Sequence, residues 1–158
     1  MSNQPLEHYT TNQRFDLITL FDVLEHLPEI ETDMDKLVEL LSPAGIIALV
    51  TPNAAGLQRK LLGNRWFQFK PVEHLYYFSP RTLRRISSDH GLRIVHLSRS
   101  GQYADTTFLS DRLRRYGFGP LARIFDTAAR LLGLEGKSWY ADTASMFAVM
   151  EKAGGNET

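Results

Sequence analysis

The sequence has no cysteine, no long apolar run and no excess of charge of either sign. Without cysteine the chain has no disulfide, no thiol nucleophile and no cysteine-bound zinc. No stretch is long and apolar enough to span a bilayer, and the polar leader, residues 1–14, lacks the basic-then-apolar pattern of a signal peptide. Basic and acidic residues number 18 each, so charge argues against a nucleic-acid partner. These absences predict a cytoplasmic protein.

The chain is also poor in glycine at its start, because the first glycine is Gly45. Its 158 residues nevertheless suffice for one domain with a real core. Residues 17–21 form a short apolar run, typical of a strand that is buried on both faces of a parallel sheet. Residues 29–41 place apolar side chains at helical spacing, residues 42–45 end this helix, and residues 46–50 form a second apolar run. Strand, helix and strand predict a βαβ unit with a right-handed crossover.

The remainder predicts further short elements. A basic helix at 56–62 precedes an aromatic-rich segment, and Ser79-Pro80 starts a helix that stops at Gly91. The last elements are a strand at 92–97, a helical insertion or lid at 103–134, a strand at 146–150 and a loose tail at 153–158. Residues 15–152 thus make up the folded part.

Three ionisable or metal-binding side chains follow the first strand directly: Asp22, Glu25 and His26. Ligands of open α/β sheets bind outside the carboxyl ends of the strands, so this position favours a functional site. The alternative is structural: the carboxylates cap the following turn and His26 packs against it. A short motif alone leaves the two interpretations about even.

Three blocks of sequence together resemble the second half of a class I S-adenosylmethionine-dependent methyltransferase. They are residues 15–18 (Phe-Asp-Leu-Ile) leading to 22–28 (Asp-Val-Leu-Glu-His-Leu-Pro), residues 41–45 (Leu-Ser-Pro-Ala-Gly) before a strand ending Thr51-Pro52-Asn53, and residues 73–83 (Glu-His-Leu-Tyr-Tyr-Phe-Ser-Pro-Arg-Thr-Leu). The resemblance implies an α/β fold, a partial Rossmann-like sheet of the family's strands four to seven. Its last two strands form an antiparallel terminal hairpin, with the helical insertion between them.

The sequence departs from the family in one respect. The family binds its cofactor with a glycine-rich turn after its first strand and an acidic residue after its second, and neither is present here. We therefore expect a truncated domain, the C-terminal part of such an enzyme, which binds S-adenosylmethionine poorly and is inactive alone. The resemblance places cofactor contacts at Phe21, Asp22 and Val23. The structural alternative is a buried Phe21 beside an Asp22 that caps a turn.

The resemblance extends to a metal site formed by Asp22, Glu25, His26 and His74, similar to that of small-RNA 2′-O-methyltransferases; ubiquinone-pathway O-methyltransferases share the first three positions. Two carboxylates suit Mg or Mn, and imidazoles shift the preference toward manganese, cobalt or zinc. Such a metal would hold an acceptor hydroxyl and lower its pKa. Alternatively, His74, with Glu25 and His26, acts without metal as a general base, or His74 donates to Glu25.

The resemblance thus implies methyl transfer to an oxygen or nitrogen of a small-molecule acceptor. The alternative is a non-catalytic interaction module that completes its half-sheet with a partner. In either case the exposed edge of the first strand predicts a homodimer. Arginines beside apolar faces in 103–134 would suit a membrane surface, although a lid packed on the sheet explains the same pattern. Arg59, Lys60, Arg65 and Lys70 are either a substrate surface or a solvated rim.

Overall fold

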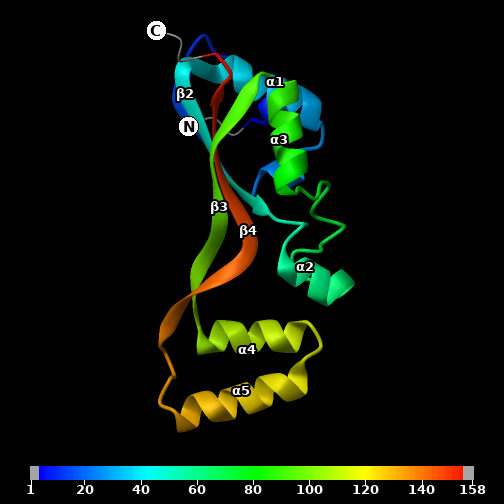
Figure 1. The fold of residues 1–158 in the computed structure, drawn as a ribbon, viewed down its shortest axis with the longest axis vertical. Helices are drawn as coiled ribbons and strands as arrows, with labels where there is room; N and C mark the ends of the chain where they lie inside the picture. Colours follow the sequence, from blue (N-terminus) through cyan, green and yellow to red (C-terminus); the bar gives the residue numbers. More distant parts are fainter. Residues whose placement is uncertain (1–3, 155–158) are drawn as a thin grey trace.

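A computed structural model describes residues 4–154 and shows one four-stranded sheet with helices against it (Figure 1). The sheet contains β1 (Phe15–Phe21), β2 (Leu41–Pro52), β3 (Leu92–Asp105) and β4 (Ser138–Lys152), in the order β1-β2-β4-β3. The pair β1–β2 is parallel, and β2–β4 and β4–β3 are antiparallel. The predicted βαβ unit and the predicted terminal hairpin are both confirmed.

Two helices cover the sheet and close the core. Helix α1 (Ile30–Leu40) and helix α3 (Pro80–Asp89) lie on the same side of the sheet in Figure 1. They bury Met34, Leu37 and Leu83 against the central strands β2 and β4. The start of α3 follows from its sequence, because Ser79 and Thr82 form a reciprocal capping box and Pro80 holds the first helical position.

The strand β1 is not buried on both faces, as its apolar run had predicted. It pairs with β2 alone, and Leu17 and Phe21 are 55% and 56% exposed. A fully apolar strand normally reports two covered faces. Among residues 4–154 no strand pairs with the outer edge of β1, so its apolar sequence and its exposure disagree.

Residues 42–45, predicted to end the helix, follow its last residue, Leu40, and already belong to a strand. The strand β2 already begins at Leu41, and its register against β1 shifts between Phe15 and Leu17. A Cβ on Gly45 would lie 2.8 Å from the carbonyl oxygen of Phe15. The glycine therefore allows the two strands to approach at this irregularity.

The strands β3 and β4 continue well beyond the sheet as a two-stranded ribbon (Figure 1). The ribbon carries α4 (Thr106–Arg115) and α5 (Gly119–Leu131) at its far end. These helices pack on each other and lie away from the sheet. The predicted lid packed on the sheet is thus wrong in its placement, and the helical part of 103–134 begins only at Thr106.

Shorter elements complete the described residues. Leu6–His8 (η1) makes one 3₁₀ turn within the predicted leader, and Leu6 packs against the core. Helix α2 (Leu57–Leu62) follows β2. Of the predicted tail, Ala153 donates its N–H to the Gly91 carbonyl at 2.8 Å, and 155–158 lie outside the described residues, as do 1–3. No helix among residues 4–154 has the length and apolarity needed to cross a membrane.

Candidate functional site

The site begins where β1 ends, in a single 3₁₀ turn. Asp22 adopts a left-handed backbone conformation, with φ of 52°, and the turn η2 (Leu24–His26) follows. No side chain caps this turn, so the interpretation of Asp22 as its cap finds no support. The strained residue redirects the chain so that Glu25 enters the protein interior, where it is 1% exposed.

Glu25 joins three segments that are distant in sequence. Its carboxylate accepts a hydrogen bond from the Thr51 hydroxyl at 2.9 Å, at the end of β2. Its backbone carbonyl accepts from the N–H groups of Leu75 and Tyr76, at 2.8 and 3.2 Å. Burial raises the pKa of the Glu25 carboxyl, although the Thr51 hydrogen bond opposes the effect. Glu25 thus joins residues 75–76 to the end of β2, at the carboxyl edge of the sheet.

His26 and His74 meet edge to face, with ring centroids 4.9 Å apart. The Nδ1 atom of His26 lies 2.6 Å from the carbonyl oxygen of Glu73. Because a carbonyl can only accept, this nitrogen must donate, and in the neutral ring the Nε2 atom is then unprotonated. The hydrogen bond to Glu73 therefore fixes the tautomer of His26.

His74 is 4% exposed, and burial lowers the pKa of its imidazole, with further lowering by His26 and Lys70. The ring is therefore neutral near pH 7. Its Nδ1 atom is buried and has no hydrogen-bond partner among the described residues. A buried polar atom without a partner is uncommon in folded proteins, and it indicates a place for a bound water, ion or ligand.

Glu25, His26 and His74 form one cluster, in which one ligand atom from each lies within 4.8 Å of the others. Their side chains line a polar cavity of about 290 Å³. Asp22 lines the same cavity but is not a member of the cluster. Three of the four residues predicted to converge therefore do so closely, and the fourth stands at the wall.

The cluster fits a divalent metal in its donor types. One carboxylate and two imidazoles suit manganese, cobalt or zinc better than magnesium. The unpartnered Nδ1 atom of His74 and the fixed tautomer of His26 are both consistent with metal ligands. Because a spread of 4.8 Å is wide for ligands that each lie about 2.0–2.2 Å from one ion, small side-chain rotations would have to accompany binding.

The residues predicted to contact the cofactor lie at the exposed end of β1. Phe21 is exposed rather than buried, and Val23 is 37% exposed. The N–H of Asp22 donates to the Val50 carbonyl at 2.9 Å. These residues could supply one wall of a cofactor site, because the Phe21 and Val23 side chains are accessible at the end of the strand.

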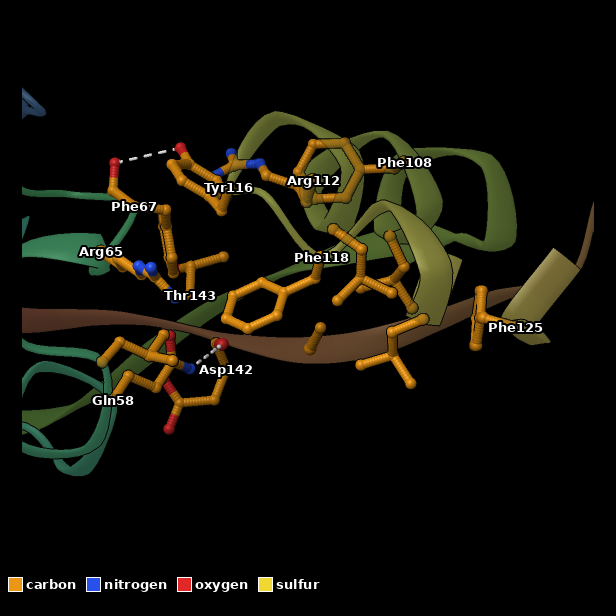
Figure 2. A pocket seen from close by; sticks show the side chains of 15 residues that line it. Gln58, Arg65, Phe67, Phe108, Arg112, Tyr116, Phe118, Phe125, Asp142 and Thr143 are labelled. Carbon is orange, nitrogen blue, oxygen red and sulfur yellow. Dashed lines mark hydrogen bonds between the residues drawn. The ribbon is translucent and has the colours of Figure 1, made fainter. Parts of the chain in front are cut away.

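A second, larger cavity was not predicted from the sequence. It has about 540 Å³ and is lined mainly by apolar side chains of the insertion, among them Leu113, Phe118 and Phe125 (Figure 2). Phe67, Arg112 and Thr143 line both this cavity and the polar one. The apolar residues of 103–134 had indicated packing, but only the ribbon's path brings them beside the cluster.

The basic residues that were considered as a substrate surface divide in the structure. Arg65 lines the larger cavity, and Lys70 lines the polar one. Lys70 is paired with Glu73 at 3.0 Å, and Arg59 lies over the ring of Phe69 at 5.3 Å. Thr51, which holds Glu25, was predicted only as a strand end. Its position at the end of β2 was the available signal.

Comparison with known proteins shows the family. The family model described as "Methyltransferase domain" matches residues 2–97, more than half of the chain. This chain therefore belongs to the methyltransferase family, and its fold is that of the Rossmann-like, S-adenosylmethionine-dependent class. No curated protein matches.

Solved structures support the same fold at low sequence identity. A protein from Bacillus halodurans C-125 matches 95% of this chain and 69% of its own, with TM-score 0.55 and 10% identity. Magnesium protoporphyrin IX methyltransferase from Synechocystis PCC 6803 gives TM-score 0.51 and 14% identity, over 94% of this chain and 49% of its own. The N-methyltransferase NodS from Bradyrhizobium japonicum WM9 gives TM-score 0.50 and 14% identity, over 96% and 52%. This chain thus spans about half the length of the last two.

Proposed function

We propose that this chain supplies the acceptor side of a methyltransferase that moves a methyl group from S-adenosylmethionine to an oxygen or nitrogen of a small molecule. The observation that carries the proposal is the buried cluster of Glu25, His26 and His74 at the carboxyl end of β1. It lies where ligands of open α/β sheets bind. The comparisons support the family; by their names, one structural relative is an N-methyltransferase and another is a magnesium protoporphyrin IX methyltransferase.

The proposed chemistry is an in-line displacement with a positioned base. The acceptor atom attacks the methyl carbon as the carbon–sulfur bond breaks, so the positive sulfonium becomes a neutral thioether. The acceptor's proton then passes to a neutral imidazole. His74 is suited to this role because its pKa is lowered and its Nδ1 atom has no other partner among the described residues. Glu25 and His26 orient the ring and the acceptor.

In a second form of this proposal the same cluster holds a metal ion, which its donor types suit. Glu25, His26 and His74 would hold the ion, with Asp22 at the wall of the cavity. When bound, such an ion would polarise the acceptor hydroxyl and lower its pKa. Manganese fits the donors better than magnesium. With the ion bound, His74 would serve as a ligand rather than as the base, and the cluster would still align the acceptor atom.

The cofactor S-adenosylmethionine would contact Phe21, Asp22 and Val23. These 158 residues contain no glycine ahead of Gly45, and therefore no glycine-rich turn before β1 whose amide groups could receive the cofactor. We propose that residues 1–158 alone bind S-adenosylmethionine weakly and are inactive.

A second candidate function rests on the outer edge of β1. The exposed Leu17 and Phe21 and an adjacent apolar cavity of about 330 Å³ would suit a module that completes its sheet with another polypeptide. The sequence encoded directly upstream distinguishes the two. A strand followed by a Gly-x-Gly loop there favours the enzyme, and its absence favours the module.

The test of the enzyme uses the full-length protein and the variant His74→Asn. We expect turnover to fall about 10²-fold or more, because the proton acceptor is lost, while the dissociation constant for S-adenosylmethionine stays the same. His96→Asn is the matched control, since His96 lies on β3, outside the cluster, and its ring nitrogen lies 3.1 Å from the Ser98 hydroxyl. Normal turnover of His74→Asn would contradict the acceptor-site assignment.

Two further measurements separate the parts of the proposal. Chelation should abolish activity, and manganese should restore it, only if the metal variant holds; no effect of chelation leaves the base. Calorimetric titration of residues 1–158 with S-adenosylmethionine should show weak binding or none. Tight one-to-one binding would show that residues 21–23 and their neighbours suffice, and that the account of the cofactor site is wrong.

A further inference from the structure

The two cavities near the cluster differ in character and share three residues. The polar cavity holds Glu25, His26 and His74. The larger one is apolar, and its volume of about 540 Å³ falls within the range of about 300–1,000 Å³ that small-molecule sites occupy. Phe67, Arg112 and Thr143 form the boundary between them. A single ligand that crosses this boundary would meet an apolar chamber at one end and the reactive cluster at the other.

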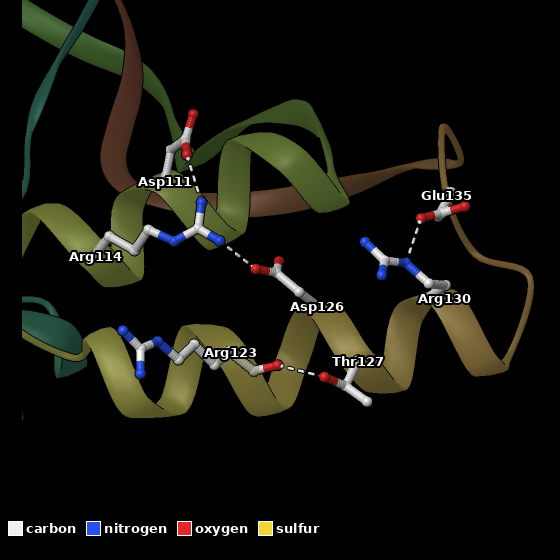
Figure 3. Close-up of polar contacts among 7 residues, drawn as sticks. All are labelled: Asp111, Arg114, Arg123, Asp126, Thr127, Arg130 and Glu135. Atoms are coloured by element: carbon white, nitrogen blue, oxygen red, sulfur yellow. Dashed lines mark hydrogen bonds and ion pairs between the residues drawn. The ribbon is translucent and has the colours of Figure 1, made fainter.

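Arg112 is the charged group at this boundary. Its guanidinium carbon lies 4.6 Å from the ring centroid of Phe67 and 4.7 Å from that of Phe108. Both distances are those of cation–π contacts. Within residues 4–154, no carboxylate pairs with Arg112 or with Arg65, the other arginine of the larger cavity. Two other arginines of the insertion are different, since Arg114 contacts Asp111 and Asp126, and Arg130 contacts Glu135 (Figure 3).

Two hydrogen bonds join the segments that form the walls of the chamber. The Tyr116 hydroxyl donates to the Phe67 carbonyl at 3.2 Å, and the Gln58 amide donates to the Asp142 carbonyl at 3.0 Å. Figure 2 shows these two contacts on opposite sides of the Phe118 ring. The first contact joins the end of α4 to the segment that contains Phe67, and the second joins α2 to β4. The chamber is thus bounded by four separate segments.

We infer that the methyl acceptor is an amphipathic anion. Its apolar body occupies the chamber lined by Leu113, Phe118 and Phe125, its carboxylate or phosphate group lies against Arg112, and its reacting oxygen or nitrogen reaches the Glu25–His26–His74 cluster. This inference rests on the proposed function for the reacting atom. The chamber and Arg112 make a binding prediction that needs no methyl transfer.

The first test measures binding of simple amphiphiles to residues 1–158 by calorimetry, without S-adenosylmethionine and below the micellar concentration. The probes are octanoate, decanoate and dodecanoate, with dodecyltrimethylammonium as the cationic counterpart. We expect affinity for the carboxylates to rise about fourfold per added methylene as apolar surface is buried, and the ammonium probe to bind at least about tenfold more weakly. Equal affinity for both head groups, or no dependence on chain length, would overturn the inference.

Variants then locate the probe. Arg112→Gln should weaken dodecanoate binding about tenfold or more, whereas Arg115→Gln, an exposed arginine of the same helix outside the cavity, should not. Leu113→Trp should block the chamber by filling it. Ile124→Ser should not, because Ile124 on α5 is 67% exposed and lies outside the chamber. An unchanged affinity in Arg112→Gln, or a loss in Ile124→Ser equal to that in Leu113→Trp, would overturn the assignment.

These outcomes are independent of the test of catalysis. Thermal melts show whether each variant is folded, and any unfolded variant is replaced by Arg112→Met or Phe118→Trp, for which the same directions hold. Amphiphile binding in a protein that transfers no methyl group would remove the proposed function and keep the chamber as a binding site. Methyl transfer by the full-length protein without amphiphile binding would keep the enzyme and overturn this inference.

Discussion

Gly101 shows how one residue holds the site and the insertion in relation to each other. It lies where the register of β3 against β4 shifts, between Ser100 and Gly101, and it lines the polar cavity. A Cβ at this position would collide with the backbone carbonyl of Ala141. The close approach of the two strands therefore needs a residue without a side chain.

We expect Gly101→Ala to lower the free energy of unfolding by about 1–3 kcal/mol, because the backbone of the ribbon must move to admit the methyl group. Denaturant titration measures the change. Gly119→Ala is the control, since nothing lies within 4 Å of its Cβ and it begins α5; it should be neutral or slightly stabilising. A Gly101→Ala protein as stable as the control would show that the ribbon tolerates displacement here.

The cluster of Glu25, His26 and His74 could be predicted from the sequence, but its detailed geometry could not. Asp22, Glu25 and His26 follow a strand, and His74 precedes a clear helix start, so a shared edge of the sheet was foreseeable. The left-handed backbone of Asp22 and the bond from Thr51 to Glu25 were not, because they depend on tertiary contacts. They decide that Glu25 turns inward and Asp22 does not join the cluster.

At the scale of elements, α1 and α3 are joined by one histidine. His90 ends α3, and its two ring nitrogens lie 2.7 Å from the Asp35 carboxylate and 2.8 Å from that of Glu31, both on α1. Both nitrogens can donate only in the imidazolium form. Burial alone would lower the pKa of His90, but the hydrogen bonds to Asp35 and Glu31 prevail and raise it above its ordinary value of 6.5.

A raised pKa in the folded state gives a defined pH dependence. The stabilisation is complete below the ordinary pKa and is lost as the pH rises through the folded value. We expect His90→Gln to lower the free energy of unfolding by about 1 kcal/mol at pH 5.5, since both carboxylates are exposed and screened. The difference should shrink by pH 9. Arg85→Gln, which removes an exposed pair at 3.7 Å, should change nothing measurable, and a His90→Gln effect that is the same at both pH values would contradict the account.

The insertion shows where sequence patterns stop being informative about elements. The ribbon residues 98–105 have no apolar alternation, because that part of β3 extends beyond the core. Their pairing with residues 138–147 is set only by contact across the chain. The helical pattern after them was correct, but its place in space was not. Membrane contact through 103–134 stays a prediction; the ion pairs in Figure 3 show that Arg114 and Arg130 serve the insertion's own packing.

At the scale of the whole molecule, the two edges of the sheet are unlike each other. The edge strand β3 carries a register shift between Ile94 and His96 and a charged Arg93 that pairs with Glu151. Irregularity and charge are the usual protection of an edge against association. The edge strand β1 has neither in its second half: residues 17–21 pair in regular register with β2, and their outward apolar side chains are exposed.

We therefore expect residues 1–158 to self-associate through β1, as the sequence had predicted, and not through β3. Sedimentation velocity over a range of concentrations should show a dimer, and Leu17→Lys should shift it toward monomer by placing a charge on the apolar edge. Val95→Lys makes the same change at the other edge, where Val95 is 49% exposed, and should leave the dimer intact. A monodisperse wild-type monomer at high concentration would contradict the prediction.

The full-length protein extends the test, because an enzyme that covers β1 with its own preceding strands should be monomeric at the concentrations where residues 1–158 dimerise. A full-length protein that still dimerises through Leu17 would favour the interaction module.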